Sequence, residues 1–229
     1  IECEPNLKAR ETTLAGVVEK TGATFIPPYD FMDVIEGQAT CALEFIEDQD
    51  NLDIIMAPVG GGGLLGGTAL TAHYLNSKIE VIGAEPKGAD DAFQSFELIK
   101  AYVSDILLAT DPQIIEAMRL IYERMKIVVE PSCAVPLAAL LANQDRFRGK
   151  KVGIILSGGN VDLGSCLSKL LFLAHRFIDD IMDISTNSFF KQFGVGCIRI
   201  NPVRKKYINE VIFWVSPDAC SREPCVSKS

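Results

Sequence analysis

Over the first 165 residues, short apolar runs of strand length alternate with stretches in which apolar residues recur at helical spacing. The strand-length runs lie at 23–26, 53–57, 80–84, 105–108 and 151–156. The helical stripes lie at 8–20, 39–46, 64–75, 111–125 and 131–143. Strands that are apolar throughout and alternate with helices are typical of a parallel sheet covered on both faces. We therefore predict an α/β fold with an open, mostly parallel sheet and helices on both faces.

Local signals mark the ends of several of these segments. Gly22 follows the first helical stripe, where a C-cap glycine belongs. Asp111 is expected as the N-cap and Pro112 as the first residue of a later helix. After Gly164 the apolar residues lose a clear period, and we treat 166–229 as a tail whose structure the sequence does not predict.

Composition excludes several classes of function. With 22 basic and 30 acidic residues, the net charge of −8 argues against binding to nucleic acid or anionic membranes. No apolar run reaches the ~18 residues that span a bilayer. Seven cysteines, an odd number without a C-x-x-C pair, indicate a reducing cytoplasm and no structural zinc site. The start, Ile1-Glu2, has neither an initiating Met nor a signal core, so we expect a chain entered partway.

Four consecutive glycines follow the strand expected at 53–57 and open the helix expected at 64–75. They are Gly60, Gly61, Gly62 and Gly63. Their bare backbone lets an anion reach the N–H groups at the positive end of the helix. A tight turn that needs positive φ would require only one or two glycines. The loop therefore predicts a phosphate site at the carboxyl end of a strand, where α/β sheets bind ligands.

A second glycine-containing loop, 157–160, follows the strand expected at 151–156. Its glycines allow close approach, and the hydroxyl of Ser157 is placed to hydrogen-bond a polar group of a ligand. A dinucleotide site is an alternative, because Gly61, Gly63 and Gly66 satisfy G-x-G-x-x-G and Glu85 ends the next strand. Against it, the glycine loop is not in the first βαβ unit, and the second loop stays unexplained.

Several short motifs occur in a fixed order along the chain. They are DIIMAPVGGGGL at 53–64, AEP at 84–86, ADD at 89–91, QS at 94–95, MK at 125–126, VEP at 129–131 and LSGGNVDL at 156–163. In this combination they resemble serine racemases and threonine (serine) dehydratases, fold-type II enzymes that use pyridoxal 5'-phosphate (PLP). The resemblance implies an amino-acid substrate, serine or threonine, which is racemised or dehydrated, and a homodimer as in the family.

The resemblance also implies roles for individual residues. Gly60 to Gly63 and the Leu64 N–H would cradle the PLP phosphate, and Ser157 would hydrogen-bond the pyridine nitrogen. A neutral hydroxyl there makes the ring less electron-demanding than a carboxylate partner would, which suits racemisation and β-elimination.

Five further residues match other sites of the family. Glu85, the Ala89 carbonyl and Asp91 match its divalent-cation site, and oxygen ligands favour Mg²⁺, Mn²⁺ or Ca²⁺. Glu130 and Asn160 match positions that meet a nucleotide effector, ATP, in animal relatives. For Glu130 the alternative is an acid that interacts with a helix N-terminus.

The chain departs from the family pattern in two places. The lysine that bonds the cofactor aldehyde, in Ser-x-Asn/Phe-x-Lys-x-Arg-Gly, does not occur here, nor does the segment with the second catalytic base. A stretch that relatives carry near 96–101 is also missing. We expect a small-domain remnant at 1–35, a large PLP-binding domain at 36–165 and an atypical tail at 166–229, with no catalysis by this chain alone. The alternatives are a non-catalytic PLP- or phosphate-binding regulatory fragment and an NAD-binding domain.

Overall fold

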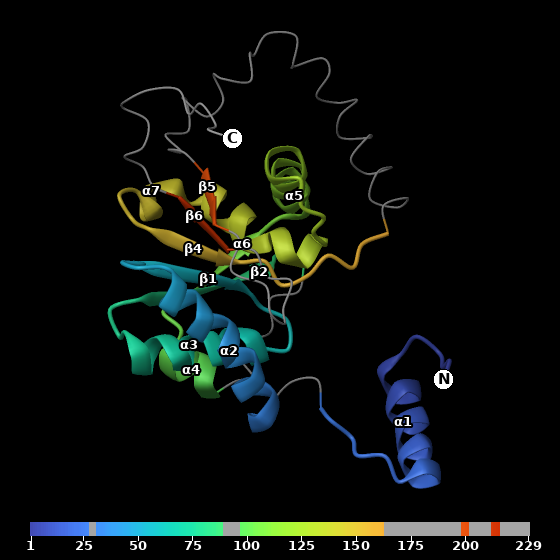
Figure 1. Cartoon of the computed structure of the whole chain (residues 1–229). Helices are drawn as coiled ribbons and strands as arrows, with labels where there is room; N and C mark the ends of the chain where they lie inside the picture. The colour runs from blue at the N-terminus through green and yellow to red at the C-terminus, as the bar shows by residue number, and fades with distance from the viewer. Residues whose placement is uncertain (28–30, 89–96, 163–197, 202–211, 216–229) are drawn as a thin grey trace, which may run out of the picture.

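The computed structural model describes residues 1–27, 31–88, 97–162, 198–201 and 212–215, which form one sheet flanked by helices (Figure 1). The strands are β1 Ile54–Pro58, β2 Glu80–Pro86, β3 Asp105–Ala109, β4 Val152–Ile155, β5 Ile198–Asn201 and β6 Ile212–Val215. Their order across the sheet is β3-β2-β1-β4-β6-β5. β1 to β4 pair with one another in parallel, whereas β6 is antiparallel to both β4 and β5. The predicted α/β fold with a mostly parallel sheet is confirmed.

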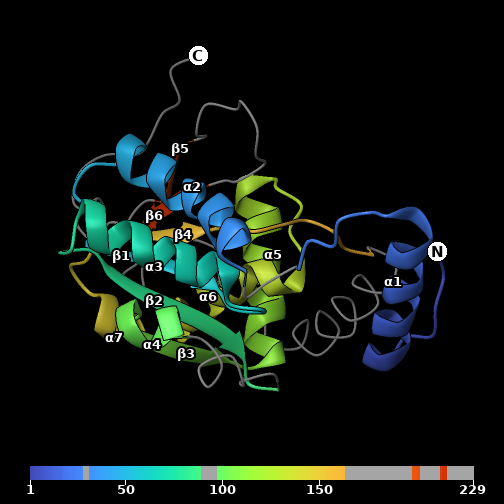
Figure 2. The same cartoon turned by 90° about the horizontal axis from the view of Figure 1, so that it is seen from below.

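The described helices are α1 Leu7–Thr21, α2 Met32–Asp48, α3 Gly63–Leu75, α4 Glu97–Tyr102, α5 Asp111–Met125, α6 Pro131–Ala142 and α7 Gln144–Phe147. Apart from α1, they form a layer on each face of the sheet (Figures 1 and 2). Ile54 and Met56 of β1 join the core under α5 and α6, whereas Ile55 and Ala57 join the core under α2 and α3. This alternation explains why β1 is apolar throughout, since both of its faces are buried.

Two of the helix ends can be compared directly with the sequence prediction. Gly22 caps α1 in the left-handed conformation with φ 67°, as predicted, and its N–H bonds the Val18 carbonyl. The start of α5 was predicted one residue late. Thr110 is the N-cap, and its N–H donates to the side chain of Gln113 at 2.8 Å, as in a capping box. Asp111 is thus the first helical residue, where its charge still interacts favourably with the helix dipole.

The strand predicted at 23–26 does not form. This segment lies outside any strand, and the side chains of Phe25 and Ile26 are 49% and 68% exposed. A strand needs a neighbour to take its backbone hydrogen bonds, and no described strand lies beside this one. Helix α1 stands apart from the sheet in both views (Figures 1 and 2).

The described residues of the tail extend the sheet. β6 pairs with β4 from Val152↔Val215 to Ile155↔Ile212, so the edge of β4 is covered by an antiparallel neighbour. Sequence periodicity did not predict these short strands. Among the described helices, none combines the length and the apolar character that a bilayer crossing requires.

Candidate functional site

The strand order places one switch point in the parallel part of the sheet. From β1 the chain moves outward to β2 and β3, and it then returns to β4 on the other side of β1. In open α/β sheets, ligands bind at the carboxyl ends of the strands that flank such a point. The glycine loop follows β1, and Ser157 follows β4 by two residues. The topology thus brings the two loops that the sequence singled out to the same crevice.

The glycine loop contains residues of two kinds. Gly62 has φ 82°, a left-handed conformation that glycine adopts at little cost, and it is the N-cap of α3. Gly60 and Gly63 have no positive φ, and a Cβ built on either would meet no other atom within 4 Å. The conformation of a turn therefore explains Gly62, but neither conformation nor packing explains Gly60 and Gly63.

The loop opens into a hollow of about 270 Å³, close to the smaller ligand sites of proteins, which start near ~300 Å³. Its lining residues are Gln38, Pro58, Val59, Gly60, Gly61, Gly62, Gly63, Leu64, Ser132 and Ser157. All six residues predicted for cofactor binding therefore border one space. Gln38 of α2 and Ser132 of α6 were not predicted, because neither residue belongs to one of the motifs, although Ser132 directly follows VEP at 129–131.

Two helix N-termini contribute residues to this hollow. α3 begins at Gly63 and α6 begins at Pro131, one residue before Ser132. In the described part of the chain no side chain caps either helix, so the first N–H groups of α3 receive no side-chain acceptor there. The positive ends of both helix dipoles favour an anion in the hollow.

The second loop is held against the segment that precedes α6. The Glu130 N–H donates to the Gly158 carbonyl at 3.1 Å. A Cβ at Gly159 would lie 2.6 Å from the Val128 carbonyl oxygen, so only glycine allows this approach. Glu130 is half-buried and accepts a hydrogen bond from Ser132 Oγ at 3.0 Å, whereas Asn160 is exposed.

Only one of the three predicted metal ligands can be located. Glu85 lies near the carboxyl end of β2 and is 2% exposed. Ala89 and Asp91 fall in 89–96, outside the described residues. Within the described ranges, no group of three His, Cys, Asp or Glu side chains is arranged to hold a metal ion.

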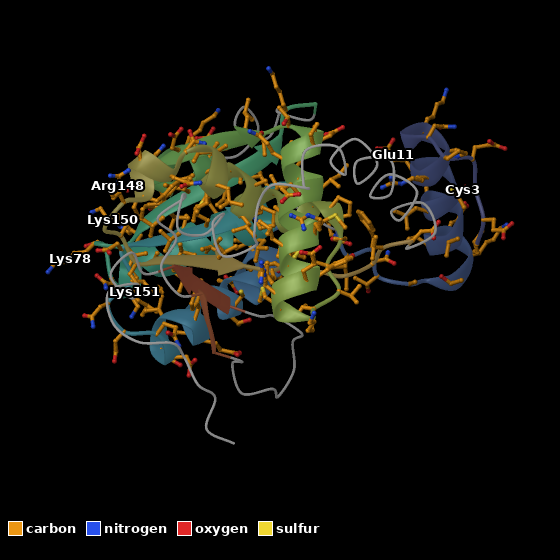
Figure 3. All side chains as sticks on the ribbon, turned by 90° about the horizontal axis from the view of Figure 1, so that it is seen from above. Cys3, Glu11, Lys78, Arg148, Lys150 and Lys151 are labelled. Atoms are coloured by element: carbon orange, nitrogen blue, oxygen red, sulfur yellow. The ribbon has the colours of Figure 1, made fainter. Side chains whose placement is uncertain are left out.

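Lysines and a second hollow lie at the other end of the sheet, where the parallel strands begin. Lys78, Lys150 and Lys151 lie near the amino ends of β2 and β4 (Figure 3). A hollow of about 240 Å³ is lined there by Lys78 and by His73 and Tyr102, whose ring centroids are 4.6 Å apart. This end is remote from the switch point, and no lysine is among the described residues that line the hollow at the glycine loop.

Comparison with known proteins identifies the family. Residues 1–158 match the family "Pyridoxal-phosphate dependent enzyme". The chain is 44% identical to beta-hydroxyaspartate dehydratase of Paracoccus denitrificans, over 71% of this chain and 60% of the relative. It is 42% identical to serine racemase of Dictyostelium discoideum, over 74% of this chain and 62% of the relative.

Solved structures lead to the same family. The crystal structure of the Dictyostelium discoideum serine racemase superposes with a TM-score of 0.66 at 43% identity, over 70% of this chain and 61% of that one. Maize serine racemase has a TM-score of 0.68 at 34% identity, with 77% and 64% covered. The chain thus spans about three fifths of the length of these relatives. As its motifs predicted, this chain belongs to the fold-type II pyridoxal-phosphate dependent enzymes and is similar to serine racemase.

Proposed function

We propose that the hollow at the switch point binds PLP. The phosphate would lie on the N–H groups of Gly60 to Gly63 and Leu64, and Ser157 would hydrogen-bond the ring nitrogen. The observation that carries the proposal is the empty space at Gly60 and Gly63, where a Cβ would meet nothing within 4 Å. Glycines that neither the fold nor the turn requires are explained by an anion that must approach the backbone closely.

We infer a β-hydroxy-α-amino acid as the substrate class of the complete enzyme. The relatives are named for serine and hydroxyaspartate, and both of these amino acids carry a hydroxyl on Cβ. PLP, when bound, supplies an electron sink for the electron pair left at Cα after its proton is removed. This chain would contribute the phosphate cradle and a neutral hydrogen-bond partner, Ser157, for the ring nitrogen. Gln38 and Ser132 would supply polar contacts at the border of the same space.

By itself, this chain is proposed to bind PLP without a covalent bond and without turnover. The hollow has no lysine among its described lining residues, and the family's lysine motif does not occur in the sequence. A non-catalytic, PLP-binding regulatory role is the second candidate, and the same uncapped N-terminus of α3 supports it. Family membership favours both over the NAD-binding alternative.

Three further features of the complete protein are proposals of the same kind. A divalent cation would be held by Glu85, whose buried carboxylate is one of the hard oxygen ligands that such ions prefer, together with the Ala89 carbonyl and Asp91. A nucleotide effector would meet Asn160, which ends the Ser157 loop, and Glu130, whose N–H bonds the Gly158 carbonyl of that loop. The assembly would be a homodimer, as in the family, and it would be cytoplasmic, as the odd number of cysteines led us to expect.

Calorimetric titration with PLP and with pyridoxal, which lacks the phosphate, tests the proposed site. We expect PLP to bind at least about tenfold more tightly than pyridoxal, because charge-assisted bonds to backbone N–H groups are worth ~1.5–3 kcal/mol each. Intact mass after borohydride treatment should show no stoichiometric PLP adduct.

A matched pair of glycine variants gives the control. Gly63→Ala places a methyl group beside the proposed anion and should abolish the preference for PLP. Gly16→Ala is equally uncrowded, but it lies in α1 and should leave binding unchanged. Equal affinity for PLP and pyridoxal in the unmodified chain would refute the phosphate cradle.

A further inference from the structure

Ser157 lies in a part of the chain that no strand or helix holds in place. Residues 156–162 have no regular secondary structure, so their backbone groups need other partners. On one side, the Gly158 carbonyl accepts the Glu130 N–H at 3.1 Å. A Cβ on Gly158 would lie 3.1 Å from Glu130 Oε1, so the two segments are in close contact there.

The other contact to this loop comes from Cys133, in the first turn of α6. Its side chain is completely buried, and the backbone N–H groups of Gly158 and Ser157 face its sulfur closely enough to lower its pKa against the larger effect of burial. The Cys133 N–H in turn donates to the Glu130 carbonyl at 3.1 Å. The segment 157–158 therefore has its N–H groups facing the Cys133 sulfur and its Gly158 carbonyl hydrogen-bonded to the Glu130 N–H.

We propose that Cys133 is a positioning residue, which fixes the Ser157 hydroxyl at the place where it meets the ring nitrogen of PLP. The inference rests on the proposed function, because it assigns a purpose to the location of Ser157 in the hollow. Its neighbour Ser132 lines that hollow, so the first turn of α6 presents one face to the ligand and the other to the loop.

The chemistry of the thiol agrees with a positioning role. Burial raises the pKa of Cys133, and the two facing N–H groups oppose this effect only in part. The side chain is therefore a neutral thiol at physiological pH. A neutral thiol is a weak acceptor that tolerates two amide donors, and it is a poor nucleophile. An alanine would leave both N–H groups without an acceptor, whereas a serine would keep an acceptor of similar shape.

The experiment compares two ligands that differ only at the ring nitrogen. PLP and its deaza analogue, in which C–H replaces that nitrogen, are titrated against the unmodified chain and against Cys133→Ala, Cys133→Ser and Cys41→Ala. Cys41 is also buried but lies in α2, so its variant controls for loss of a buried thiol. We expect Cys133→Ala to weaken PLP binding about tenfold and to leave the deaza analogue unaffected. Cys133→Ser should restore most of the affinity, and Cys41→Ala should change neither ligand.

Equal weakening of both ligands by Cys133→Ala, or an unchanged preference for PLP, would overturn the inference and leave the phosphate cradle intact. Failure of the unmodified chain to bind PLP, its analogue and inorganic phosphate would overturn the proposed function and this inference together. Amide hydrogen exchange provides a measurement that needs no variant. The Ser157 and Gly158 amides should be protected although they lie in no strand or helix, and exchange at the unprotected rate would contradict the contact with sulfur.

Discussion

Gly66 and Gly67 are adjacent in α3, yet the structure predicts that alanine has opposite effects at the two positions. A Cβ on Gly67 would lie 2.7 Å from the Ile35 carbonyl oxygen and 2.9 Å from the Ala39 nitrogen, both in the backbone of α2. A Cβ on Gly66 would lie 3.7 Å from the Leu98 side chain, an ordinary contact distance. Of these two glycines, only Gly67 is required for the close crossing of α2 and α3.

The magnitudes follow from these contacts. Backbone atoms cannot turn aside as the end of a side chain can, so Gly67→Ala should cost about 3 kcal/mol of packing, the upper end for overpacking. At either position, the higher helix propensity of alanine should add about 1 kcal/mol to the free energy of unfolding. The expected net changes in the free energy of unfolding are a loss of about 2 kcal/mol for Gly67→Ala and a gain of about 1 kcal/mol for Gly66→Ala.

Urea denaturation followed by far-UV circular dichroism measures both changes. The urea midpoint should fall for Gly67→Ala and rise for Gly66→Ala, with similar slopes in all three proteins. A thermal scan should show Gly67→Ala melting about 4–8 °C below the unmodified chain. Shifts in the same direction for both variants, or an unchanged midpoint for Gly67→Ala, would show that α2 and α3 do not cross this closely.

Three other predictions follow from single contacts. Arg146 forms ion pairs with the carboxylates that begin β2 and β3, so Arg146→Met should lower the free energy of unfolding by about 1 kcal/mol in low salt. An equal loss of stability in high salt would contradict an ionic origin. The stability that depends on the raised pKa of Cys133 should be complete below about pH 8.5, the pKa of an unfolded thiol, and should be lost as the pH rises through the raised value. A thiol dye should accordingly label the exposed Cys3 in the native chain and Cys133 only in denaturant, and rapid native labelling of Cys133 would refute its burial. Tyr122→Phe removes the hydrogen bond that the Tyr122 hydroxyl donates to the Val129 carbonyl at 2.6 Å, and chemical denaturation should show a loss of about 1 kcal/mol; no loss would mean that water replaces this bond.

Much of the fold could be predicted from local patterns, because burial on both faces leaves a strand uniformly apolar. The segments at 53–57, 80–84 and 105–108 are strands in the structure, within one or two residues of the predicted limits. The segment at 23–26 is also largely apolar but forms no strand, because strand formation depends on a partner that composition does not reveal.

The candidate site could be predicted only in part. The glycine quartet and Ser157 could be recognised as motifs. Anion binding needs a bare backbone, and each of the two motifs directly follows an apolar run that predicts a strand. Gln38 and Ser132 were not, because both lie outside the motifs and border the hollow only through the packing of their helices.

The amino-acid sequence by itself determined the class of fold, the family and the two loops that carry the chemistry. Periodicity and glycine spacing are local properties, so they can be recognised from the order of the residues alone. Only the tertiary structure decided that the two loops share one hollow, because β1 and β4 are far apart in the chain and become neighbours through parallel pairing. It also separated Gly62, which the turn requires, from Gly60 and Gly63, since backbone torsion and empty space are properties of the folded chain.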